Sequence, residues 1–101
     1  MAYAHKVTTE FLGDTYTVGT NIFFSPNEAI NIINGTYSIA VLCAALISPQ
    51  YLAAILIAKF LFSTALEGSK RKDHNNNKLH YHGVRVKISY LSIPMVIVLS
   101  R

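Results

Sequence analysis

Residues 37–62 read YSIAVLCAALISPQYLAAILIAKFLF, a stretch of 26 residues in which Lys59 is the one charged side chain. A helix that is apolar on every side belongs inside a larger protein or in a membrane. At about 1.5 Å per residue, this stretch would form a helix of roughly 39 Å, longer than the roughly 30 Å hydrocarbon core of a bilayer. It therefore predicts an apolar helix that meets lipid or a protein partner.

Two local signals predict where helices begin. Ser25 and Glu28 form a capping box around Pro26, which suits the first helical position. Ser48 and Pro49 repeat part of that signal, and there Pro49 either kinks one continuous helix or starts a second one. We favour the kinked helix over a hairpin of two helices, 26–47 and 49–67. The predicted fold is mainly α with flanking β, built on a long apolar kinked helix or helical hairpin over about 26–67.

The flanking segments predict short strands. Residues 1–24 are rich in Thr and aromatic side chains, with turn residues at Gly13 and Asp14. Residues 84–90 alternate between apolar and polar side chains, which indicates a strand within a strand-like region at 84–98. We expect one small domain over 1–101, with four parts: a polar arm (1–24), an apolar helical segment (25–67), a basic loop (68–83) and a strand-like tail (84–101).

Charge is scarce and unevenly placed. Apolar residues make up 51% of the chain and charged residues 14%, so much of the surface is expected to be hidden from water. Residues 1–36 carry one basic and three acidic side chains, a net charge of −2, whereas residues 67–101 carry seven basic and two acidic ones, a net charge of +5. If the helix crosses a membrane once, this difference predicts that the basic C-terminal side is cytoplasmic.

The basic side chains after the helix are candidate contacts for anionic lipid or phosphate. They are Lys70, Arg71, Lys72, Lys78, Arg85 and Lys87. Their position beyond an apolar helix favours a lipid surface. Nucleic acid, with Tyr81 and Tyr90 as stacking partners, is the less favoured ligand.

No metal, cofactor or catalytic site is predicted. His80 and His82 would face the same way on a strand, so that with His74 they are weak candidates for metal ligands, but their Asn-rich surroundings favour solvated histidines. Cys43 lies in an apolar run, where a thiol behaves as a small hydrophobe. The acidic residues show no pairing, and no small-molecule substrate is inferred.

Two partial resemblances imply nothing further about function. The segment Asn21-Ile-Phe-Phe-Ser-Pro26 resembles the start of the serpin fold, where a strand ending in Ser-Pro leads into a buried helix. The following residues depart from that pattern, and 101 residues are too few for the large sheet and reactive loop of that family. The order of polar arm, apolar helix and basic loop is similar to that of a conjugative pilin. A pilin continues into a second long helix, however, whereas residues 84–90 here predict a strand.

These observations give three hypotheses for a non-enzymatic protein. The first is a small integral membrane protein that acts as an accessory or structural subunit. The second is a self-assembling subunit of a filament, capsid or extracellular particle, with the apolar helix buried between copies. The third is a small soluble α+β binding domain. Membrane lipid, protein partners and further copies of the chain are the expected partners.

Overall fold

The computed structural model describes residues 2–43, 46–72, 77–90 and 95–101. The strands are β1 (Tyr3–Phe11), β2 (Asp14–Phe24), β3 (Lys70–Lys72), β4 (Leu79–Tyr81), β5 (Val84–Ser89) and β6 (Met95–Ser100). The helices are α1 (Pro26–Ile33), α2 (Ile39–Cys43), α3 (Leu52–Ala58) and α4 (Phe62–Gly68), with short 3₁₀ turns η1 (Pro49–Tyr51) and η2 (Lys59–Leu61) on either side of α3.

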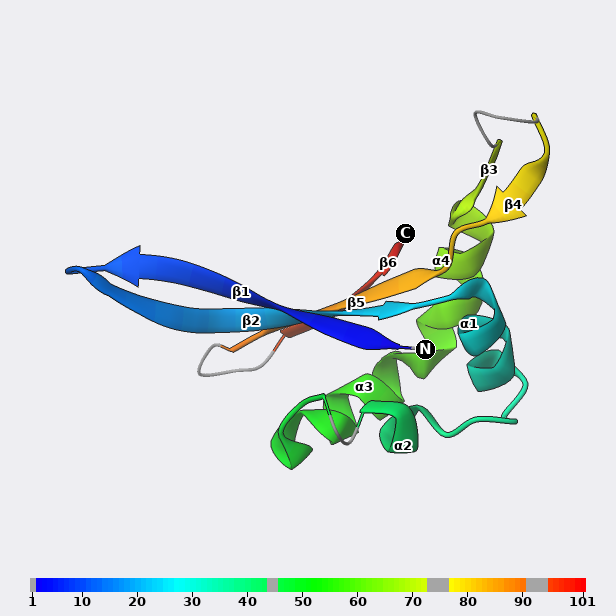
Figure 1. Cartoon of the computed structure of the whole chain (residues 1–101). Coiled ribbons are helices and arrows are strands. Elements are labelled where there is room, and N and C mark those ends of the chain that lie inside the picture. Colours follow the sequence, from blue (N-terminus) through cyan, green and yellow to red (C-terminus); the bar gives the residue numbers. More distant parts are fainter. Residues whose placement is uncertain (1, 44–45, 73–76, 91–94) are drawn as a thin grey trace.

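The strands of the two termini form one antiparallel sheet, in the order β1-β2-β5-β6 (Figure 1). Strands β3 and β4 form a separate two-stranded sheet. The prediction of a mainly α fold is therefore wrong: the structure is mostly sheet, with 43% strand and 36% helix. The error has a physical cause. Pairing between residues 14–24 and 84–89 depends on contacts about 65 residues apart, which local periodicity does not report.

Strands β1 and β2 form a long hairpin, in which Tyr3 is paired with Phe23 and Phe11 with Asp14. Its two-residue turn is Leu12-Gly13, and both residues have a positive φ, 53° and 83°. This is the turn type whose twist matches that of the strands, and it favours Asn-Gly or Asp-Gly. A leucine in the left-handed region costs about 1–2 kcal/mol.

The outer half of this hairpin projects beyond the sheet (Figure 1). Strand β5 pairs with residues 19–24 of β2, and within the described part of the chain only Val18 of residues 8–18 has a backbone bond beyond the hairpin, from the N–H of Tyr90. Every side chain from Thr8 to Val18 is exposed. We call residues 8–18 the β-arm; it contributes to the 48 Å length of the molecule.

The core lies between one face of the sheet and the helices. Helices α3 and α4 pack against β6, and α1 packs against α4 and β2. The sheet contributes alternate residues that are fully buried: Ile22, Phe24, Val84, Val86 and Ile88. The helices contribute Ala29, Ile32, Ile39, Ile55 and Phe62.

Helix α1 begins with the capping box. The backbone N–H of Glu28 donates to the Ser25 hydroxyl over 3.2 Å, and the N–H of Ser25 donates to the Glu28 carboxylate over 3.0 Å. Burial by itself raises the pKa of Glu28, but the hydrogen bonds with Ser25 and other favourable interactions outweigh it and hold the pKa below its usual value. The ionised carboxylate therefore suits this position.

Replacing Ser25 tests the role of the capping box in the stability of the protein. Ser25→Ala should lower the free energy of unfolding by about 1 kcal/mol, because the N–H of Glu28 loses its acceptor. Ser25→Thr retains a hydroxyl and should lose less. Urea denaturation followed by circular dichroism measures both variants, and an equal loss in the two would argue against a capping role.

The segment 26–67 is neither one kinked helix nor a simple hairpin. Helix α1 ends at Ile33, and Gly35 then adopts a left-handed φ of 79°, a common helix-ending conformation. A new helical run starts at Pro49 and continues through η1, α3, η2 and α4 to Gly68. Pro49 thus lies at a helix start, where its missing N–H costs nothing.

Candidate functional site

The helical run Pro49–Gly68 has an inner and an outer face. Tyr51, Ile55, Ala58 and Phe62 recur every three or four residues and are buried. This spacing places them along one side of a helix, where α3 and α4 pack against β6. The predicted apolar helix is therefore partly a core helix.

The outer face is also apolar. Leu56, Ile57 and Phe60 are exposed by 50%, 73% and 74%. They project from the side of the run opposite the buried residues, so contact with the sheet does not account for them. Exposed apolar clusters of this kind mark surfaces that bind a protein or a membrane.

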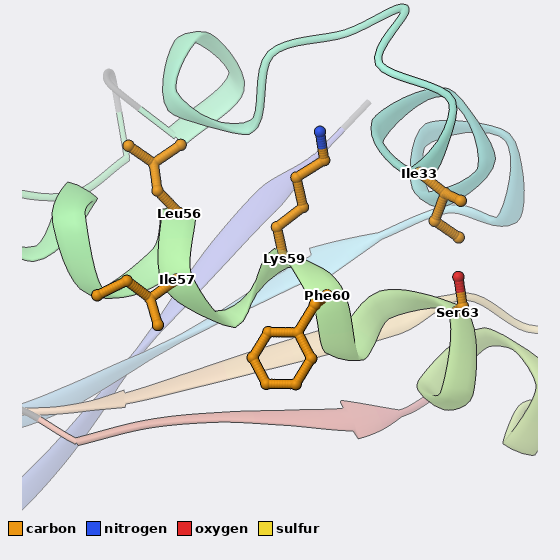
Figure 2. Close-up of a pocket in the computed structure, with 6 residues that line it drawn as sticks. All are labelled: Ile33, Leu56, Ile57, Lys59, Phe60 and Ser63. Carbon is orange, nitrogen blue, oxygen red and sulfur yellow. The ribbon is translucent and has the colours of Figure 1, made fainter.

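A pocket of about 370 Å³ opens at this outer face, between the run and α1. Figure 2 shows its lining: Ile33 of α1 faces Ser63 of α4, and Lys59 extends from the helical run on the same side as Leu56. The remaining lining residues are Leu56, Ile57 and Phe60. We call this the helical-layer pocket; it is an apolar hollow with one cation.

Lys59 pairs with no carboxylate among the described residues. A lysine beside apolar side chains can bury its methylene stem and keep its ammonium group in water. The pocket can therefore accept an apolar group with a negative charge next to it.

The run Pro49–Gly68 is long and apolar enough, by length and composition alone, to cross a membrane. Core helices of soluble proteins share this length and apolarity, so these two properties do not distinguish a membrane helix from a core helix. The sequence placed the apolar helix at residues 37–62. The described residues of that range lie in α2, η1, α3, η2 and the first position of α4, and they do not form one continuous helix.

The predicted basic residues fall into separate groups. Lys70, Arg71 and Lys72 form strand β3, all exposed, and the Arg71 guanidinium donates to the carbonyl oxygen of Arg101. Arg85 and Lys87 lie on β5, on the face of the sheet that points away from the helices, because Val84, Val86 and Ile88 alternate with them. Lys78 is exposed just before β4.

The two tyrosines proposed for stacking on nucleic acid already have partners within the chain. Tyr90 stacks on Tyr51 with ring centroids 4.9 Å apart, and its hydroxyl bonds to that of Thr20. The Tyr81 hydroxyl donates to the Glu67 carboxylate over 3.0 Å, which raises the pKa of Tyr81.

The candidate metal ligands are not brought together. His80 is exposed on β4, whereas Nδ1 of His82 donates to the carbonyl oxygen of Ser69 over 3.0 Å. His74 lies outside the described residues. Within the described part of the chain, no group of three His, Cys, Asp or Glu side chains could hold a metal ion.

Cys43 is buried at the end of α2. Burial raises the pKa of its thiol to about 11, so the reactive thiolate is scarce at neutral pH. This environment suits packing.

Sequence reasoning missed the tip of the β-arm. Phe11 and Leu12 are exposed by 64% and 86%. The sequence contained one signal, a bulky apolar residue immediately before Gly13 at a predicted turn. Such turns normally carry Asn or Asp there.

A comparison of the chain with protein-family models, curated proteins and solved structures gives no match.

Proposed function

We propose that this protein is a non-enzymatic structural subunit that assembles with further copies through the outer face of its helical layer. The observation that carries the proposal is the helical run that is apolar on both sides. Its inner side packs on the sheet, and its outer side surrounds an open pocket. The apolar side chains of the outer side are not buried within a single chain. They therefore suit a surface that another molecule covers.

The packing of the inner side of the run Pro49–Gly68 on the sheet favours assembly with a second copy over insertion of this run into a membrane. A helix crossing a bilayer alone would have to leave the sheet and uncover Ile22, Phe24 and Val86. Uncovering a buried side chain of this size costs about 1.5–3 kcal/mol, so the cost of the whole rearrangement is on the order of 10 kcal/mol. Assembly through the outer side leaves the core in place.

Attachment to a membrane surface is the second candidate. It is favoured by the apolarity of the run Pro49–Gly68 and by the basic strand β3 that follows it. Anionic lipid would contact Lys70 and Lys72 in this case, and the helical layer would lie at the interface instead of crossing it.

Cell fractionation and sedimentation of the purified chain test the proposal together. Assembly predicts that the chain leaves membranes in an alkaline carbonate wash, and that its sedimentation coefficient rises with concentration in detergent-free buffer. A monomer that is released by carbonate and floats with anionic vesicles would support the second candidate instead. Retention after carbonate would favour a helix embedded in lipid and contradict both.

A further inference from the structure

The β-arm is poorly supported within one chain. Residues 8–18 are exposed on both faces of a two-stranded ribbon. Such a ribbon is marginally stable in water unless another element packs against it. The β-arm is therefore the kind of element that contact with a partner would stabilise.

The tip of the arm has the shape of an apolar knob. Leu12 occupies a turn position with φ 53°, where Asn or Asp would be favoured, and its side chain is 86% exposed. Phe11 lies beside it and is 64% exposed. Leu12 in this backbone conformation destabilises the isolated hairpin. A destabilising residue of this kind points to a function other than the stability of the hairpin.

Charge at the tip complements charge at the helical-layer pocket. Glu10 and Asp14 flank the knob, and neither pairs with a cation among the described residues. The pocket is lined by apolar side chains and by Lys59. The two surfaces are therefore complementary in shape and charge: the tip is an apolar knob with two carboxylates, and the pocket is an apolar hollow with one ammonium group.

We infer that the tip of the β-arm inserts into the helical-layer pocket of a second copy of this chain. The tip cannot reach its own pocket, because the arm extends away from α1 and α4 (Figure 1). Phe11 or Leu12 fills the hollow between Ile33 and Phe60, and Glu10 and Asp14 lie near Lys59 of the neighbour. A contact between two different surfaces is head-to-tail, so repetition gives a filament or a closed ring.

This inference rests on the proposed function, since it names the interface through which the copies assemble. Leu12→Asn tests the knob. It creates an Asn-Gly turn, which is the favoured sequence for this hairpin, so the arm should be at least as stable as before. The dissociation constant of assembly should nevertheless rise by about tenfold or more, because a buried apolar anchor is lost.

A charge exchange tests the pairing. Lys59→Glu alone and Glu10→Lys/Asp14→Lys alone should each weaken assembly by about tenfold, because like charges then meet at the contact. Mixing the two variants should restore it, since each tip then meets a pocket of opposite charge. Sedimentation velocity follows the unaltered chain, the two variants and their mixture, and circular dichroism confirms that each variant is folded.

The outcomes separate the inference from the proposed function. If the unaltered chain stays monomeric, both are wrong. If it assembles, but Leu12→Asn assembles equally well or the mixture shows no recovery, the knob-and-pocket contact is wrong. The proposed function would then survive with another interface.

Discussion

Phe62→Ala is expected to lower the free energy of unfolding by about 3–5 kcal/mol, whereas Phe60→Ala should change it by less than about 0.5 kcal/mol. Phe62 is fully buried, and its ring meets that of Phe24 edge to face with centroids 5.4 Å apart. Its removal leaves a cavity between the helical run and the sheet. Phe60 is two residues earlier and 74% exposed, so its removal leaves none.

Thermal unfolding of both variants checks this difference. For a domain of about this size, 1 kcal/mol corresponds to about 4–8 °C, so Phe62→Ala should lower the Tm by more than about 10 °C. Phe60→Ala is the matched control, since it makes the same chemical change on the same helical run. Protein should be dilute, because assembly would stabilise the folded state. Similar losses in the two variants would mean that the run does not pack with one face on the sheet.

Replacing Ile57 and Phe60 together by Glu should abolish assembly while leaving the monomer folded. Both side chains are more than 70% exposed in the monomer, so two carboxylates there remain hydrated. In an assembly the same positions are covered. The loss of two apolar contacts of about 1.5–3 kcal/mol each corresponds to a loss of affinity on the order of 100-fold or more.

Asn27→Glu/Leu79→Glu is the control for this prediction. It also adds two acidic side chains at exposed positions, one on α1 and one on β4, away from the helical-layer pocket. Sedimentation velocity should show the control assembling like the unaltered chain. Assembly that survives Ile57→Glu/Phe60→Glu would exclude the outer face as the interface. Equal loss in both variants would point to a general effect of charge.

The choice of residues depends on the tertiary structure. Ile55 and Ile57 are the same residue type in the same apolar run, yet Ile55 is fully buried and Ile57 is 73% exposed. A charged residue at Ile55 would test folding, whereas one at Ile57 tests binding. A run that is apolar on every side gives no sign of which face meets the sheet.

The candidate site was only partly predictable. The sequence marked the apolar run and Lys59 within it, because their composition is a local property. The pocket also needs Ile33 and Ser63, which different helices bring together. The basic residues were predicted as one group, but β3 and β5 belong to different sheets and divide them.

The N-terminal strands were underestimated for a reason visible in the β-arm. A strand with one buried face alternates between apolar and polar residues, but the arm exposes both faces from Thr8 to Val18. No alternation is required there, and it is confined to Thr15–Val18. Strand β5 has one face in the core, and its alternation predicted it well.

By itself, the sequence determined those features that depend on neighbours along the chain. These are the capping box at Ser25 and the alternating strand at Val84–Ser89, but not the helix start at Pro49, where a kinked continuous helix was favoured. Each depends on side chains within a few residues, so local chemistry is sufficient. Only the tertiary structure decided that the two ends of the chain form one sheet and that the apolar run buries one face on it. It also placed the exposed knob and the open pocket far apart on one molecule, because these positions arise from contacts between residues distant in sequence.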